Sequence, residues 1–231
     1  MRKLVLFDID GTLLLTAGAG RRAIVAALSA EVGRSDAFDR IRFDGKTDPQ
    51  IVAELLEAAG HDEPRESARV QRLCRSYVTH LEAELERPTT RTTLMPGVLE
   101  LLDRLEARDD AVLGLLTGNL ERGAALKLRS GGIDPIRFRV GAYGSDAAHR
   151  PHLPEIAANR AAPFFGRTPT GSEVVIIGDT PADIHCGQGI GARAIAVATG
   201  SYGVSDLAAC GPHAVFSDLS ATEQVVDAIF R

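Results

Sequence analysis

The chain has 231 residues, of which 45% are hydrophobic and 25% charged, so it can bury a substantial core in one large domain or in a domain with an insert. Its formal net charge of −5, without a long basic run, gives no support to nucleic-acid binding, and no apolar stretch reaches the length that crosses a membrane. The three cysteines are widely spaced and the N-terminus lacks the pattern of a signal peptide, so we expect a cytoplasmic protein with reduced thiols.

The first predicted element is a short buried strand that ends in two carboxylates. Residues 4–7 (LVLF) are typical of a strand buried on both faces, and Asp8 and Asp10 follow them. Side chains alternate along a strand, so the two carboxylates start on one side, where they repel each other and lose hydration. Mg²⁺, which prefers hard oxygen ligands, would relieve this conflict. Because Asp is common in turns, the pair taken alone favours a simple strand end.

Residues 16–91 are predicted to be entirely helical. Residues 16–20 (TAGAG) suit a hinge, and helices are expected over residues 21–32, 48–59 and 64–86. At the start of the second helix, Asp48 is the expected N-cap and Pro49 the first helical residue. Lys46, in the polar loop before this helix, is the single lysine between residues 16 and 91. A polar linker follows at residues 88–95.

Beyond residue 95, strands alternate with helices. Strands are expected at residues 111–116, 139–143, 173–177, 193–197 and 214–216, and helices at residues 96–107, 120–129, 153–161, 181–189 and 220–230. Ser220 and Glu223 have the spacing of a capping box at the last helix. The alternation predicts a doubly wound, Rossmann-like parallel sheet, which binds ligands beyond the carboxyl ends of its strands. We therefore expect an α/β core, residues 1–15 and 92–231, with a helical cap, residues 16–91, inserted at that edge.

Two further strand ends carry polar residues. Thr117 and Gly118 stand where the strand at 111–116 gives way to a helix, and a hydroxyl with an open backbone N–H at a helix N-terminus suits a phosphate. Asp179 ends the strand at 173–177, and Asp183 follows one helical turn later, so both carboxylates can face the same point. Taken alone, the first motif favours an ordinary strand-to-helix turn. For the second, the alternative is a helix cap plus a surface charge, but this motif directly after an apolar strand is more specific than the first.

The combination is more specific than any single motif. Asp8 and Asp10 within DIDGT, Thr117 within TGN, and Asp179 and Asp183 within GDTPAD together resemble the haloacid dehalogenase-like hydrolase superfamily. The helical insert after the first strand is similar to the helical-cap branch, with phosphoglycolate phosphatase-like and phosphoglucomutase-like enzymes as relatives. The resemblance extends over the whole chain, although the match of the helical insert is only architectural.

The resemblance implies a role for each of these residues. Asp8 would be the nucleophile that forms an aspartyl-phosphate, and Asp10 the general acid and then the general base. Asp8, the Asp10 carbonyl, Asp179 and Asp183 would hold Mg²⁺. Thr117 and Gly118 would bind the phosphoryl oxygens.

One family feature is missing: the family usually has a lysine between the ends of the second and fourth strands of the core, where it pairs with the nucleophile and the phosphate. None of the three lysines, Lys3, Lys46 and Lys127, stands where that motif belongs. Arg150 and Arg160 are the candidates to replace it, and we favour Arg150, which lies in a loop between a short strand and a helix. An arginine keeps a permanent charge and can contact a phosphate through two N–H groups. Arg150 taken alone could equally be a surface residue.

The function implied by the resemblance is Mg²⁺-dependent hydrolysis of a small phosphorylated metabolite, with phosphoglycolate-like compounds as candidates. Alternatives on the same scaffold are a sugar-phosphate mutase and a phosphonatase, which would need Lys46 as a Schiff-base lysine. A phospho-accepting signalling module is a rival from another class, but such modules lack a helical insert and are shorter. Lys46 could select substrates that carry a second anionic group, or it could be a solvated turn residue. The oligomeric state stays open.

Overall fold

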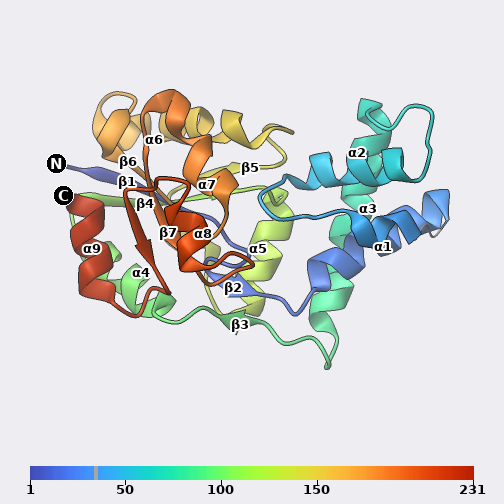
Figure 1. Cartoon of the computed structure of the whole chain (residues 1–231), viewed down its shortest axis with the longest axis horizontal. Helices are drawn as coiled ribbons and strands as arrows, with labels where there is room; N and C mark the ends of the chain where they lie inside the picture. Colours follow the sequence, from blue (N-terminus) through green and yellow to red (C-terminus); the bar gives the residue numbers. More distant parts are fainter. Residues whose placement is uncertain (34–35) are drawn as a thin grey trace.

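A computed structural model describes residues 1–33 and 36–231 of the chain. Its centre is a six-stranded parallel sheet in the order β5-β4-β1-β6-β7-β8 (Figure 1). The strands are β1 (Lys3–Phe7), β4 (Ala111–Thr117), β5 (Val140–Tyr143), β6 (Val174–Gly178), β7 (Arg193–Val197) and β8 (Ala214–Phe216). The strand order reverses at β1, which lies between β4 and β6, so the predicted doubly wound α/β core is confirmed.

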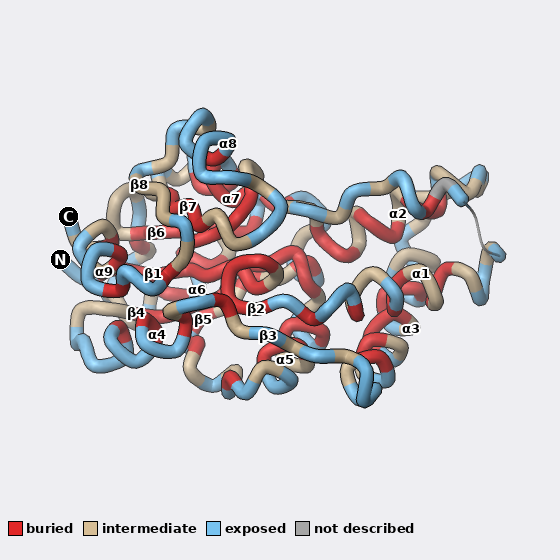
Figure 2. Tube along the Cα trace, turned by 60° about the horizontal axis from the view of Figure 1, so that its bottom comes forward, coloured by how far each residue is buried: buried red, intermediate tan, exposed pale blue. Residues whose placement is uncertain are grey.

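Helices cover both faces of the sheet because side chains of the buried strands alternate between the faces. Val5 and Phe7 of β1 pack in one apolar cluster with α4 (Val98–Glu106), α5 (Glu121–Ser130) and α9 (Thr222–Phe230). Leu4 and Leu6 pack in another with α6 (Leu153–Phe165) and the end of α7 (Pro181–Cys186). The short helix α8 (Val204–Ala208) covers β7 and β8. The central strands β1, β4, β6 and β7 are therefore almost entirely buried, as Figure 2 shows, whereas the edge strand β8 is only half-buried.

The segment between β1 and α4 forms a separate group of helices at one end of the molecule (Figure 1). It consists of α1 (Ala19–Val32), α2 (Asp48–Ala58) and α3 (Ser67–Glu86), which share an apolar cluster of their own. The chain leaves and re-enters the core side by side, through the antiparallel pair β2 (Leu14–Leu15) and β3 (Thr93–Leu94). In the described part of the chain, no helix is both long and apolar enough to cross a membrane.

Two predicted helix caps are wrong. Thr47, not Asp48, is the N-cap of α2, and its hydroxyl accepts a hydrogen bond from the Gln50 N–H at 3.3 Å. At α9 the predicted capping box does not form, because the Ser220 hydroxyl donates to Asp218 and Ala221 occupies the N-cap position. In both cases the predicted cap has another partner: the Asp48 carboxylate accepts the N–H of the distant Leu120, and the Ser220 hydroxyl binds Asp218.

Candidate active site

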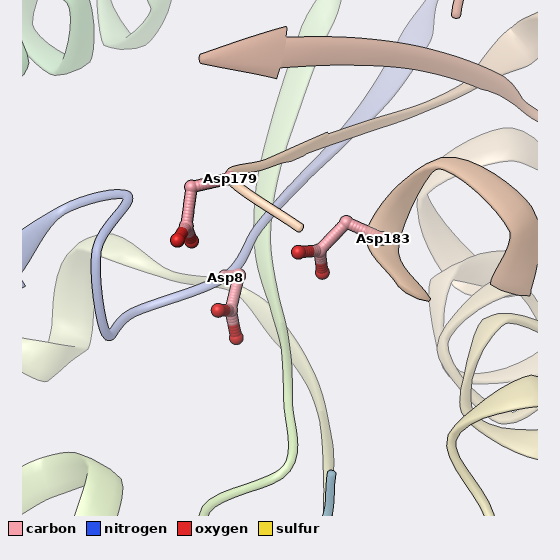
Figure 3. A group of neighbouring side chains, drawn as sticks. All are labelled: Asp8, Asp179 and Asp183. Carbon is pink, nitrogen blue, oxygen red and sulfur yellow. The ribbon is translucent and has the colours of Figure 1, made fainter. Parts of the chain in front are cut away.

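Three buried carboxylates meet beyond the carboxyl ends of two neighbouring strands. β1 and β6 pair in register up to Phe7 and Ile177, so Asp8 and Asp179 leave the sheet next to each other. Asp183 reaches the same place from the first turn of α7. One oxygen from each of the three carboxylates lies within 4.8 Å of the others (Figure 3). All three side chains are almost completely shielded from solvent.

Arg150 supplies positive charge to this cluster. It lies in a short 3-10 helix, Arg150–His152, between β5 and α6, and its guanidinium is buried. Its Nη2 is 3.1 Å from Oδ1 of Asp8 and also donates to a carboxylate oxygen of Asp183. Burial alone would lower the pKa of Arg150, but the carboxylates of Asp183 and Asp8 raise it, so the charge is permanent.

One arginine does not balance three buried carboxylates. Burial raises the pKa of Asp8 to about 6, although Arg150 opposes the shift. Burial, with Asp183 and Asp8 close by, raises the pKa of Asp179 well above its ordinary value. Converging carboxylate oxygens in a dry site are the ligand set that suits a hard divalent cation. The residues present therefore fit Mg²⁺, with Asp8, Asp179 and Asp183 as the side-chain ligands.

Asp10 lies at the mouth of the site, where its side chain is 40% exposed. Nδ2 of Asn119 donates to Oδ2 of Asp10 at 2.7 Å and to Oγ1 of Thr117 at 2.8 Å. The TGN turn is thereby linked to the first strand. Thr117 and Gly118 line a cavity of about 200 Å³ together with Asp8, Asp10 and Arg150.

A loop of the helical segment closes over this cavity. This loop, residues 45–48, is held by three hydrogen bonds that cross from the helices to the core. The Asp48 N–H donates to the Gly118 carbonyl at 2.8 Å, and the Thr47 hydroxyl donates to the Ala148 carbonyl at 2.6 Å. The Leu120 N–H donates to Oδ2 of Asp48, also at 2.8 Å. Burial raises the pKa of this carboxyl to about 6, against the opposing effect of Lys127.

Gly118 makes the close approach of this loop possible. A Cβ at position 118 would lie 2.0 Å from the backbone oxygen of Lys46, which is far inside van der Waals contact. Lys46 lines the cavity, but its ammonium pairs with Glu54 of α2. Its proposed part in substrate choice stays a prediction.

The structure brings Asp8, Asp10, Thr117, Gly118, Arg150, Asp179, Asp183 and Lys46 to one end of the sheet. Arg160 lies elsewhere: its half-exposed guanidinium binds Asp146 and the Gly141 carbonyl.

Three contacts within the site were not foreseen from the sequence. Thr12 donates to Asp179 at 2.9 Å, Asn119 donates to Asp10, and Lys127 pairs with Asp10. Of these, only the burial of Lys127 could have been predicted from the sequence. Its spacing from Ala124 and Leu128 places it on the buried face of α5.

Comparisons with known proteins give a family and several structures of similar fold. A family model for haloacid dehalogenase-like hydrolases matches residues 5–188, whereas no curated protein matches the chain. A hydrolase from Pseudomonas syringae is similar in structure, with 22% identity, a TM-score of 0.74 and 98% of both chains covered. CbbY from Rhodobacter sphaeroides, in complex with phosphate, has 19% identity and a TM-score of 0.73, over 95% of this chain and 96% of that one.

A predicted phosphoglycolate phosphatase from Haemophilus somnus has 21% identity and a TM-score of 0.68, over 97% of this chain and 98% of that one. At these identities the structural likeness establishes the fold. The family model covers most of the sequence and includes the end of the first strand, the DIDGT motif, the TGN turn and the GDTPAD motif. The chain belongs to the haloacid dehalogenase-like hydrolases.

Proposed function

We propose that this enzyme hydrolyses the phosphate ester of a small metabolite through an aspartyl-phosphate on Asp8, with Mg²⁺ as cofactor. The observation that carries the proposal is a cavity lined by Asp8, Arg150 and Asp179, with Thr117 and Gly118 on its wall and Asp183 in the carboxylate cluster beside it. Phosphoryl transfer depends chiefly on positioning and on neutralising the charge of the phosphoryl oxygens. A cation site beside hydrogen-bond donors meets both needs.

Each residue has a defined part in this reaction. A carboxylate oxygen of Asp8 attacks phosphorus, the bond from phosphorus to the leaving oxygen breaks, and Asp10 donates a proton to that oxygen. Asp10 then takes a proton from the water that attacks the aspartyl-phosphate, which releases inorganic phosphate and restores Asp8. The Thr117 hydroxyl and the Gly118 N–H hold the phosphoryl oxygens, and Arg150 keeps a positive charge beside Asp8. Mg²⁺, held by Asp8, Asp179, Asp183 and the Asp10 carbonyl, would offset the negative charge of the phosphate.

Residues 16–91 form a cap in this proposal, and substrate choice resides there because the core groups contact only features shared by all phosphomonoesters. Structures related to this one include CbbY with phosphate and a CbbY mutant with xylulose-(1,5)bisphosphate. They support a small phosphorylated metabolite as substrate, with phosphoglycolate-like compounds among the candidates.

The test is release of inorganic phosphate from a panel of phosphorylated metabolites, with Mg²⁺ and with EDTA. We expect many turnovers per enzyme with Mg²⁺ and none with EDTA. One phosphate retained per chain would instead indicate a phospho-accepting module. A rearranged sugar phosphate without free phosphate would indicate a mutase.

A comparison of Arg150→Ala with Arg160→Ala tests which arginine takes the place of the missing lysine. Arg150→Ala leaves Asp8 and Asp183 buried without their cation, a change that costs roughly 3–5 kcal/mol in other proteins. Arg160→Ala removes a half-exposed ion pair worth about 1 kcal/mol or less. We expect Arg150→Ala to lower both turnover and the free energy of unfolding in urea, and Arg160→Ala to change neither strongly. The opposite order of the two effects would place the role of the lysine on Arg160.

Lys46 tests whether the cap loop selects the substrate. Lys46 lines the cavity and its side chain is partly exposed, so in this proposal its ammonium leaves Glu54 to bind an anionic group on the leaving alcohol. Lys46→Ala is expected to raise KM for the best substrate of the panel, with little change for an aryl phosphate. Unaltered kinetics across the panel would show that Lys46 only pairs with Glu54.

A further inference from the structure

Lys127 occupies a position where the pattern of its helix calls for an apolar residue. α5 buries Ala124, Lys127 and Leu128 on one face, and the Lys127 side chain is only 6% exposed. A buried ammonium costs free energy unless it is paired, and an apolar replacement of such a pair often leaves stability unchanged. Packing alone therefore gives no reason for a lysine here.

The partner of Lys127 is the carboxylate that we propose as general acid and base. Nζ of Lys127 lies 2.8 Å from Oδ1 and 2.7 Å from Oδ2 of Asp10. Asn119 holds Oδ2 from a second direction. Asp10 lies on the turn after β1 and its side chain is 40% exposed, so it would be free to rotate without these contacts.

Residues of the helical segment lie close to the buried Lys127 side chain. A Cβ at Gly20 of α1 would lie 3.3 Å from Nζ of Lys127 and 3.8 Å from the Tyr77 hydroxyl of α3. Gly20 of α1 thus lies against the ammonium group, and the Tyr77 hydroxyl of α3 lies close to the same glycine. Lys127, Tyr77 and Gly20 all line the cavity that contains Asp10. The lysine is therefore enclosed between α5, the cap and the carboxylate that it binds.

We propose that Lys127 is a positioning residue, which holds the Asp10 carboxylate at the leaving-group side of the cavity. The inference rests on the function proposed above. A general acid must stand within hydrogen-bond reach of the oxygen that it protonates. A rotation of Asp10 away from that oxygen would slow protonation of the leaving group and activation of water, while binding of the phosphate would continue.

The first test compares Lys127→Met with Lys3→Met. Lys3 is also buried and binds the Ser172 carbonyl at 2.7 Å, but it lies at the opposite end of β1. A misplacement of about 1 Å costs on the order of 10²-fold in rate, so we expect a loss of that size in kcat for an alkyl phosphate in Lys127→Met. KM should stay within about threefold of its normal value. Lys3→Met is expected to keep kcat, even where it lowers the melting temperature.

The second test measures how the effect of Lys127→Met on the rate depends on the leaving group of the substrate. A purely structural role of Lys127 would give the same loss for every leaving group. Nitrophenolate needs little protonation, so Lys127→Met should still release about one nitrophenolate per enzyme in a fast burst before slow turnover of p-nitrophenyl phosphate. Lys127→Arg, which keeps the positive charge, should retain more kcat than Lys127→Met. It also serves as the second variant where the methionine variant folds poorly.

The decisive measurement is the double variant Asp10→Asn/Lys127→Met. If Lys127 acts through Asp10, the double variant should have nearly the same kcat as Asp10→Asn alone, since residues that act as a unit are non-additive. A further 10²-fold loss in the Asp10→Asn background, or an unaltered kcat in Lys127→Met, would overturn the role of Lys127 and leave the phosphatase intact. Absence of phosphate release by the wild-type enzyme would overturn the proposed function, and the role of Lys127 with it.

Discussion

Asp8→Asn is expected to lower turnover by a factor on the order of 10⁴ or more, as in other enzymes that lose their nucleophile. The amide keeps the shape of the side chain but cannot attack phosphorus. Asp8 is the single carboxylate that both follows β1 directly and contacts Arg150, so no described neighbour is placed to take over its role. The measurement is steady-state phosphate release, together with mass spectrometry of acid-quenched enzyme.

The quenched wild-type enzyme should carry one phosphoryl group on the peptide that contains Asp8, and Asp8→Asn should carry none. Asp227→Asn is a suitable control because Asp227 lies on α9, is 65% exposed and pairs with the exposed Arg231. It should behave as the wild type. A phosphoryl group on another residue, or substantial turnover by Asp8→Asn, would contradict the assignment of the nucleophile.

The placement of the carboxylates could be predicted because it follows from a general property of parallel sheets. Apolar runs identified β1, β4 and β6 as buried strands, and polar residues directly after such strands collect at one edge. The positions of Asp8, Thr117 and Asp179 could therefore be predicted without knowing the conformation of any loop. The position of Arg150 was harder to predict, because its contact with Asp8 depends on the short 3-10 helix after β5. Sequence spacing alone left Arg160 as an alternative.

The contacts of Lys127 and Asp48 could not be predicted in the same way. Lys127 lies ten residues beyond Thr117, and its contact with Asp10 depends on the rotation of α5 against the sheet. Asp48 fits the pattern of an N-cap, but its carboxylate accepts the N–H of Leu120, 72 residues away. Local capping rules cannot include such a distant donor. β2 and β3 were missed because strands of two residues have no detectable periodicity.

A substitution of Asp179 tests metal binding through the stability of the protein, without any assay of activity. In the absence of a cation, burial and the carboxylates of Asp183 and Asp8 raise the pKa of Asp179 well above its ordinary value. A raised pKa means that the ionised carboxylate destabilises the folded state, and that this penalty is relieved as the pH falls through the raised value. Asp179→Asn removes the charge but keeps an oxygen that can accept the hydrogen bond from Thr12.

We therefore expect opposite effects of Asp179→Asn with and without Mg²⁺. In EDTA at pH 8 the variant should melt at a higher temperature than the wild type, because three crowded carboxylates become two. A cation at 100 times its dissociation constant adds about 2.7 kcal/mol to stability, so Mg²⁺ should raise the melting temperature of the wild type by several degrees. The variant should gain much less, and its turnover should nearly vanish. Asp227→Asn should respond to Mg²⁺ like the wild type. An equal response of Asp179→Asn and wild type to Mg²⁺, or full wild-type activity in EDTA, would show that these carboxylates do not hold the cation.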